Sequence, residues 1–296
     1  MNKKITALTV TALASFALLG CNSDSDNDTE SSNVNTGDTL ILTANGMISS
    51  VDRSMPDKVV SNRKIKGLMS GDELVGIDYR PKDGKLYAVG LQGNLYTLNP
   101  NNGEAIFLRK LIADPSDTTD GNASFTQIIG DANLITVNFN PAADRLRVIS
   151  NTGQNLRINV DTGATITDGT INLATGTAAV VAGAYTNAFA GTGSTKLYSI
   201  DQNSDRIYLQ NAKAGTLGNS TALGADINTN GGGGFDIDPV SNVGFAALKL
   251  ASGNYKFFKL NLANVGTSSD AVFESHDLNN SFNSMGIRGI RSEEHT

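Results

Sequence analysis

The chain of 296 residues has one cysteine, Cys21, two histidines and no tryptophan. A single cysteine cannot form an intrachain disulfide, and once Cys21 is modified no thiolate remains for a metal site or nucleophile. His276 and the near-terminal His295 are too few for a multi-histidine metal centre and poorly placed for a Ser-His-Asp triad. We therefore predict no catalytic residues, no metal ligands and no cofactor, although an enzyme remains the alternative.

An apolar stretch stands out only at the start of the chain, where Ile5–Leu19 follows the basic residues Lys3 and Lys4. At about 15 residues it is too short to favour a membrane-spanning helix and is typical of a secretory signal. The following Leu18-Leu19-Gly20-Cys21 resembles a bacterial lipobox. We predict a lipoprotein signal peptide over residues 1–20 with lipid attachment at Cys21; an ordinary secretory signal is the alternative.

Two further segments are not expected to belong to the fold. Residues 21–38 are almost entirely Asp, Asn, Ser, Thr and Glu after Cys21, and such a composition predicts a disordered acidic tether. Residues 291–296 (RSEEHT) match the conceptual translation of a common sequencing adapter, and we interpret them as a non-native remnant. The folded domain is therefore predicted over residues 39–290.

The formal net charge of −6 disfavours nucleic acid as a partner, since nucleic-acid binding needs clustered Lys and Arg. The lipid at Cys21 would make the membrane one partner, and an envelope protein or a glycan could be another. We expect a monomer at the bacterial cell envelope. Asn22 after Cys21 favours the outer membrane, on its periplasmic or surface face.

A strand-rich pattern recurs about every 45–60 residues, which indicates a repeat architecture and favours a β-propeller. Each copy has an apolar strand containing a polar residue, a turn, and a second strand. The copies are GIDYRPKDGKLYAV (76–89), TVNFNPAADRLRVI (136–149), GFDIDPVSNVGFAAL (234–248) and the looser GAYTNAFAGTGSTKLYSI (183–200).

The repeats predict four complete four-stranded blades. Thr39–Thr43, Asn45–Asp52 and Lys58–Ile65 lack an innermost strand, which Gly286–Ile290 could supply. A fifth blade assembled from both ends of the chain would remove exposed strand edges. We predict an all-β, five-bladed propeller; residues 112–132 could hide a further hairpin, so six blades are the alternative, and a solenoid or sandwich is a second one.

These stretches resemble a bacterial family catalogued as domain of unknown function 4394. The resemblance is carried by LVGIDYRPKDGKLYAV, FNPAADRLRVISNTGQNLRINVDTGA, AYTNAFAGTGSTKLYSIDQNSDRIYLQN and the closing IRGI, and it covers residues 40–290. It implies an exported protein of propeller type. It implies no established activity and no catalytic residues.

Innermost strands of a propeller converge on an axial channel, and residues two apart on a strand point to the same side. Aligning the repeats predicts a first polar tier of Asp78, Asn138, Tyr185, Asp236 and Arg288. A second tier follows two residues on, formed by Arg80, Asn140, Asn187 and Asp238. These nine residues could bind a small ligand at the channel mouth, or they could hydrogen-bond neighbouring blades, which we favour.

A second candidate is a set of guanidinium and amide groups on adjacent strands: Arg145, Arg147, Gln154, Asn155 and Arg157. Arginine suits anion recognition, although arginines also pair with nearby acids such as Asp144 and Asp161.

Two functions remain open. The favoured hypothesis is a lipid-anchored binding or scaffold module of the cell envelope. The alternative is a polysaccharide hydrolase or lyase, which needs two carboxylates about 5–10 Å apart at a cavity. Asp78, Asp236 and Asp238 are the candidates for that role.

Overall fold

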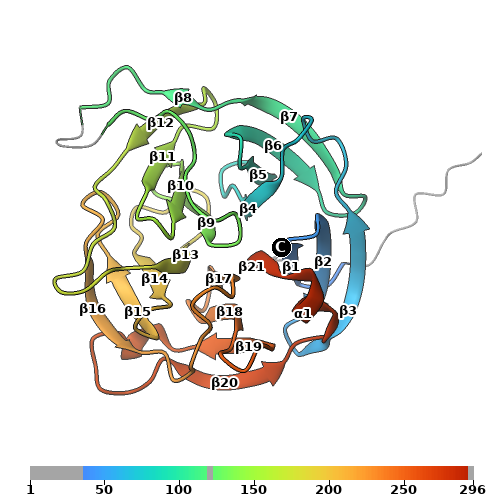
Figure 1. The fold of residues 1–296 in the computed structure, drawn as a ribbon, viewed down its shortest axis with the longest axis vertical. Coiled ribbons are helices and arrows are strands. Elements are labelled where there is room, and N and C mark those ends of the chain that lie inside the picture. The colour runs from blue at the N-terminus through green and yellow to red at the C-terminus, as the bar shows by residue number, and fades with distance from the viewer. Residues whose placement is uncertain (1–35, 119–122, 293–296) are drawn as a thin grey trace, which may run out of the picture. The chain divides into compact units, whose positions relative to one another are not determined.

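The structure is a computed structural model that describes residues 36–118 and 123–292. Four of its sheets are formed by consecutive antiparallel strands, and together with a fifth they surround one axis (Figure 1). Blade 1 comprises β4 (Leu74–Tyr79), β5 (Leu86–Gly90), β6 (Asn94–Asn99) and β7 (Glu104–Lys110). Blade 2 comprises β9 (Ile135–Asn140), β10 (Arg145–Ser150), β11 (Asn155–Ile158) and β12 (Ala164–Thr167).

Blade 3 comprises β13 (Val180–Tyr185), β14 (Leu197–Asp201), β15 (Arg206–Gln210) and β16 (Leu217–Ala222). Blade 4 comprises β17 (Gly233–Ile237), β18 (Gly244–Lys249), β19 (Tyr255–Leu260) and β20 (Val272–Asp277). The first strand of each of these blades lies nearest the axis and the last lies at the rim (Figure 1).

Blade 5 is formed by both ends of the described chain. Its strand order is β21 (Ile287–Ser292), β1 (Thr39–Thr43), β2 (Met47–Asp52) and β3 (Met55–Lys64). β21 pairs antiparallel with β1, so that Thr39 lies opposite Ser292. The prediction of five blades closed by the two ends of the chain is confirmed. β21 extends two residues past the domain boundary predicted at Ile290.

The six-blade alternative is not realised in the described residues. In its described residues, the segment that could have hidden a hairpin contributes one strand, β8 (Ile112–Ala113), which pairs parallel with β12 as a fifth strand of blade 2. The rest of this segment contributes Phe125 and Ile128 to the apolar core between blades 1 and 2. The short α1 (Ser281–Met285) precedes β21, and no helix among the described residues is long and apolar enough to cross a membrane.

The hydrophobic core lies between blades. Each pair of neighbouring blades buries its own cluster of Leu, Ile, Val, Phe and Tyr side chains, which gives one cluster per junction. Faces of both sheets contribute to each cluster, which explains why the strands are buried almost throughout in the inner part of every blade. Burial of this apolar surface holds the ring together without a disulfide.

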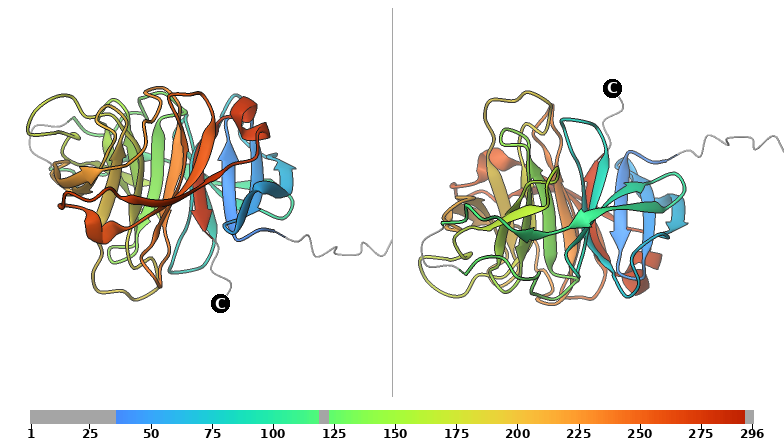
Figure 2. Two further views of the ribbon diagram at one scale, coloured as in Figure 1. Left: turned by 90° about the horizontal axis from the view of Figure 1, so that it is seen from below. Right: turned by 90° about the horizontal axis from the view of Figure 1, so that it is seen from above.

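Segments that leave one blade also bond to the next blade at the rim. The backbone of Lys66 pairs with Glu104, Asn172 pairs with Thr216, and the N–H of Val272 donates to the carbonyl of Leu223. β8 makes the equivalent contact with blade 2. Side views show the strands running between the two ends of the ring, with the connecting loops at both ends (Figure 2).

Candidate functional site at the inner-turn end

We call one end of the ring the inner-turn end because it carries the turns between innermost and second strands. These turns are residues 80–85, 141–144, 186–196 and 238–243. Three of them place a residue with positive φ at a similar point, namely Gly84, Asp144 and Asn242. Gly, Asp and Asn adopt this conformation most readily, which explains their recurrence in the repeats.

The first predicted tier joins neighbouring blades. A side-chain oxygen of Asp78 accepts a hydrogen bond from the backbone N–H of Phe139 in blade 2. Asn138 accepts one from Tyr185 in blade 3 at 2.9 Å. Asp236 accepts one from Ser292 in blade 5 at 2.7 Å. These polar side chains therefore connect innermost strands around the axis.

Two members of the predicted tier lie elsewhere. Strand register places Ala184, opposite Tyr198, at the position equivalent to Asp78, and Tyr185 is one residue further on. In blade 5 the equivalent position is held by Arg291, and not by Arg288.

Burial dominates the electrostatics of Asp78, which is 7% exposed. It raises the pKa of Asp78 to about 7, against the lowering effect of Arg291, whose Nε lies 2.6 Å from Oδ1. The nearby carboxylate of Asp236 raises the pKa further. At this level the side chains of Asp78, Asp236 and Arg291 are buried, and Asp78 and Arg291 form an ion pair.

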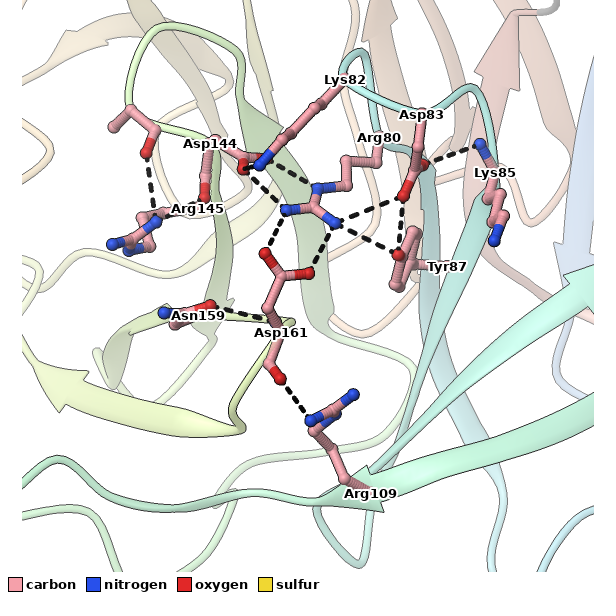
Figure 3. Close-up of polar contacts among 11 residues, drawn as sticks. Arg80, Lys82, Asp83, Lys85, Tyr87, Arg109, Asp144, Arg145, Asn159 and Asp161 are labelled. Carbon is pink, nitrogen blue, oxygen red and sulfur yellow. Dashed lines mark hydrogen bonds and ion pairs between the residues drawn. The ribbon is translucent and has the colours of Figure 1, made fainter.

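Arg80 of the second predicted tier lies at the centre of an ion-pair network (Figure 3). The buried guanidinium of Arg80 donates to both oxygens of Asp144 at 2.7 Å and to both oxygens of Asp161 at 2.8 Å. Asp83 lies 3.3 Å from it and Lys82 pairs with Asp144 at 3.1 Å. These bonds raise the pKa of Arg80 and lower those of Asp144 and Asp161. The network joins blade 1 to blade 2.

The other second-tier residues organise turns. Asn140 accepts hydrogen bonds from the N–H groups of Ala142 and Ala143. Asp238 accepts from Val240 and Ser241 within its own turn and also pairs with Arg53 at 3.1 Å. Asn187 exchanges hydrogen bonds with Asn242 of blade 4.

Arg288 lies near the opposite end of the ring. Its guanidinium donates to the carbonyl of Leu74 and to the side chain of Asn133, each at 2.9 Å, and pairs with Glu73 at 2.8 Å. It therefore connects blade 5 with blade 1 and with the segment that enters blade 2, instead of facing the inner-turn end.

In the predicted anion-binding set, Arg147, Asn155 and Arg157 are already bound to other side chains of the protein. Arg147 and Arg157 both pair with Asp168, whose side chain is fully buried, at 2.7 and 3.0 Å. Arg147 also donates to Asn155 at 2.7 Å. These arginines therefore bind polar side chains of blade 2 itself.

Two open grooves of the inner-turn end lie on either side of the turn 186–196. The 3–4 groove, with a volume of about 790 Å³, lies between the turn 186–196 and the turn 238–243. Its lining includes Asn187, Lys196, Tyr198, Asn242, Leu260, Asn261 and Phe273. The 2–3 groove, of about 600 Å³, is lined by residues that include Asn140, Tyr185, Lys196, Leu209, Gln210 and Asn211. Both volumes are in the range of small-molecule sites.

Three of the nine predicted residues line these grooves: Asn140, Tyr185 and Asn187. Sequence reasoning missed Lys196 of the turn 186–196, Gln210 of β15 and Phe273 of β20, which line the grooves. One signal was present in the sequence. The turn 186–196 is longer than the corresponding turns 80–85 and 238–243, and it forms the wall shared by both grooves.

The carboxylates proposed for a hydrolase do not face these grooves. Asp78 and Asp236 lie against Arg291 and Ser292 near the axis, and Asp238 caps its turn and contacts Arg53. The described residues also contain no cluster of His, Cys, Asp and Glu that could hold a metal ion. The geometry thus offers no support for the hydrolase alternative at these residues.

The fold defines the class of protein: this chain is a five-bladed β-propeller with a ring closed by its two ends. A family model described as "Domain of unknown function (DUF4394)" matches residues 47–292. The chain belongs to this family. No curated protein matches it.

Among solved structures, the chain is similar to two entitled "Structure of U3-55K" and "Crystal structure of RRP9 WD40 repeats". The first has 12% identity and a TM-score of 0.41, and the second 14% and 0.39. Each comparison covers 72% of this chain, and the chain spans 56% and 55% of the respective structures.

Proposed function

We propose that this protein is a lipid-anchored binding or scaffold module of the bacterial cell envelope. The observation that carries the proposal is the pair of open grooves at the inner-turn end. A closed ring of interlocked blades provides a rigid support for such a surface, and propellers commonly use the ends of the ring for binding. Fold alone does not define a ligand.

The anchor is the second part of the proposal. The lipobox-like residues 18–21 lie outside the described residues, so this part rests on the sequence. Two or three acyl chains at Cys21 would hold the protein stably on a membrane, preferably the outer membrane, and the tether would connect it to the propeller.

The anchor is tested by labelling cells with a fatty-acid analogue and fractionating their membranes. We expect the label on the wild-type protein and in the membrane fraction, and neither with Cys21→Ser. Label on the Cys21→Ser variant, or equal membrane association of both proteins, would contradict the anchor.

Binding is tested by immobilising the full chain and recovering partners from an envelope extract. Ala263→Trp is the variant that blocks the groove. Ala263 is exposed and lines the 3–4 groove, so that an indole there fills the groove without entering the core. We expect an envelope protein or glycan on the wild-type chain and less of it on the variant. Recovery of no component above background would contradict the proposal.

A further inference from the structure

The linings of both grooves contain no acidic residue, although the whole chain has 29 Asp and Glu. Their only charged lining residue is Lys196, which both grooves share. An acidic protein that keeps carboxylates out of one concave surface leaves a place where an anion is not repelled.

Lys196 lies at the boundary between the two grooves. It is exposed, and it has no ion pair with a described residue. Its backbone is held by a hydrogen bond from its N–H to the hydroxyl of Thr186 at 2.9 Å. A single exposed ammonium group, on a backbone position held by Thr186, is therefore available to a ligand that spans both grooves.

The remaining polar lining is neutral and rich in amides and hydroxyls. Asn187 and Asn242 lie on the 3–4 side, and Asn140 and Gln210 lie on the 2–3 side. Gln210 is 5% exposed; its oxygen accepts a bond from Ser199, and its Nε2 is buried with no described partner. A buried donor without a partner is costly, and a small rearrangement toward a ligand oxygen would satisfy it.

Apolar contact is provided mainly on the 3–4 side. The ring of Phe273 is 56% exposed beside Leu260 and Leu262, which line the same groove. An aromatic face combined with neutral amides and hydroxyls suits a sugar, because a sugar ring presents C–H groups on its faces and hydroxyls around its edge. In the absence of tryptophan, Phe273 is the most exposed aromatic side chain of the lining.

We propose that the two grooves form one continuous site for an acidic oligosaccharide, with a uronate carboxylate at Lys196 and sugar hydroxyls at the flanking amides. This inference rests on the proposed binding function and identifies the ligand class. A peptide is the competing occupant, and the neutral amides, hydroxyls and single exposed aromatic ring of the lining favour the sugar.

The test measures binding by calorimetry with the full chain carrying Cys21→Ser, which prevents lipidation. The probe is a hexamer of galacturonic acid, and its fully methyl-esterified form has the same backbone without the charges. We expect binding of the acidic hexamer and at least a tenfold weaker affinity for the ester, since one charge-assisted contact contributes about that factor.

Variants assign the contact to Lys196. We expect Lys196→Met to weaken binding of the acidic hexamer about tenfold and to leave binding of the ester unchanged, and Lys196→Arg to retain most of the affinity. Lys85→Met is the matched control, because Lys85 is exposed in the turn 80–85 at the same end but lies outside both grooves. It should bind the acidic hexamer as the wild type does.

The two grooves are tested separately by Ala263→Trp on the 3–4 side and Ala212→Trp on the 2–3 side. If the site is continuous, each variant should weaken binding of the hexamer. Thermal unfolding of each variant checks that its fold is intact.

The inference is overturned if the acidic hexamer does not bind at millimolar concentration, if the ester binds equally well, or if Lys85→Met and Lys196→Met have equal effects. It is also overturned if acidic peptides of equal charge bind more tightly than the hexamer. In any of these cases, a partner recovered from envelope extract would leave the proposed binding function standing.

Discussion

Arg80 shows at the scale of one residue how the ring is held at the inner-turn end. Its guanidinium is 4% exposed and contacts carboxylates from two blades. We expect Arg80→Met to lower the free energy of unfolding by about 2 kcal/mol, because the variant leaves Asp83, Asp144 and Asp161 close together without their cation, partly screened by water. Urea unfolding at neutral pH measures the change.

Lys82→Met is the control for Arg80→Met. The Lys82 side chain is 62% exposed and contacts Asp144 alone, so its loss should change the free energy of unfolding by less than about 0.5 kcal/mol. A similar effect of the two substitutions would show that Arg80 holds the blades no better than a surface pair does.

The dependence of stability on pH in the acidic range is a second test of the Arg80 network. Arg80 lowers the pKa of Asp144 and Asp161, so their contribution to stability is present above the unfolded-state pKa of about 4 and is lost as the pH falls below it. The wild type should therefore lose stability more steeply than Arg80→Met as the pH decreases from 5 to 2.5. Thermal melts across that range, compared between the two proteins, check the difference.

For Asp78 we expect the opposite dependence of stability on pH. Burial raises its folded-state pKa to about 7, so the stability linked to its protonated form is present below about pH 4 and is lost as the pH rises through 7. In Asp78→Asn the amide oxygen can still accept from Phe139, but nothing titrates. We expect the stability of the wild type, relative to this variant, to decrease by roughly 2–4 kcal/mol between pH 4 and pH 8.

The comparison uses the change with pH, so a constant offset between wild type and Asp78→Asn does not affect it. Denaturant unfolding of both proteins at several pH values supplies the curves. Parallel curves would mean that the Asp78 carboxyl titrates in the folded ring as it does in the unfolded chain.

The bounds of some strands could be predicted from the sequence better than those of others. β6 and β15 are short runs bounded by turn residues, a pattern from which strands can be located in the sequence. β13 was placed three residues late, because its run from Val180 is apolar throughout and gives no alternation to fix the register.

The error at Arg288 has a simpler origin. The chain contains Gly286-Ile287-Arg288 directly before Gly289-Ile290-Arg291, and the second of these triplets pairs with β1 in the register of Gly76-Ile77-Asp78. Sequence matching selected the first triplet. The candidate site was harder to predict, since Phe273 of blade 4 joins Lys196 of blade 3 in the lining of the 3–4 groove only through packing of the two blades.

The innermost strands of blades 4 and 5 pack so closely that an added methyl group is tolerated at one glycine and not at another. A Cβ at Gly234 of β17 would lie 2.3 Å from the backbone nitrogen of Ile290 in β21, whereas one at Gly289 would meet nothing within 4 Å. We expect Gly234→Ala to lower the free energy of unfolding by about 3 kcal/mol, since backbone must move to admit the methyl. Gly289→Ala should change it by less than about 1 kcal/mol.

Urea unfolding of the two glycine variants under the same conditions measures this contrast. Both variants replace glycine by alanine in strands that contact each other. A destabilisation caused by alanine as such would therefore lower the free energy of unfolding of both variants. Equal losses would mean that β17 and β21 have room to separate, and that the close approach does not fix the spacing of blades 4 and 5.

At the scale of the whole molecule, the ring depends on pairing between strands from opposite ends of the chain. Thr39 lies opposite Ser292, so a two-residue Asn-Gly loop could join them as a hairpin. A circular permutant that joins these residues and begins and ends within the β18–β19 turn, where a Cβ added at Gly253 would meet nothing within 4 Å, should fold with a stability close to that of the wild type. The covalent hairpin lowers the entropy cost of pairing β21 with β1, and the new break raises the cost of pairing β18 with β19 by a comparable amount.

Truncation after Met285 is the opposite case. Without β21, the innermost edge of β1 loses its partner and the cluster that contains Ile41, Phe257 and Ile290 loses one wall, so we expect an aggregating or unfolded protein. Circular dichroism and size-exclusion chromatography distinguish the two designs. A truncated chain as stable as the permutant would show that blades 1–4 form a self-sufficient unit, and pairing of the two ends would then be a consequence of the ring and not a condition for it.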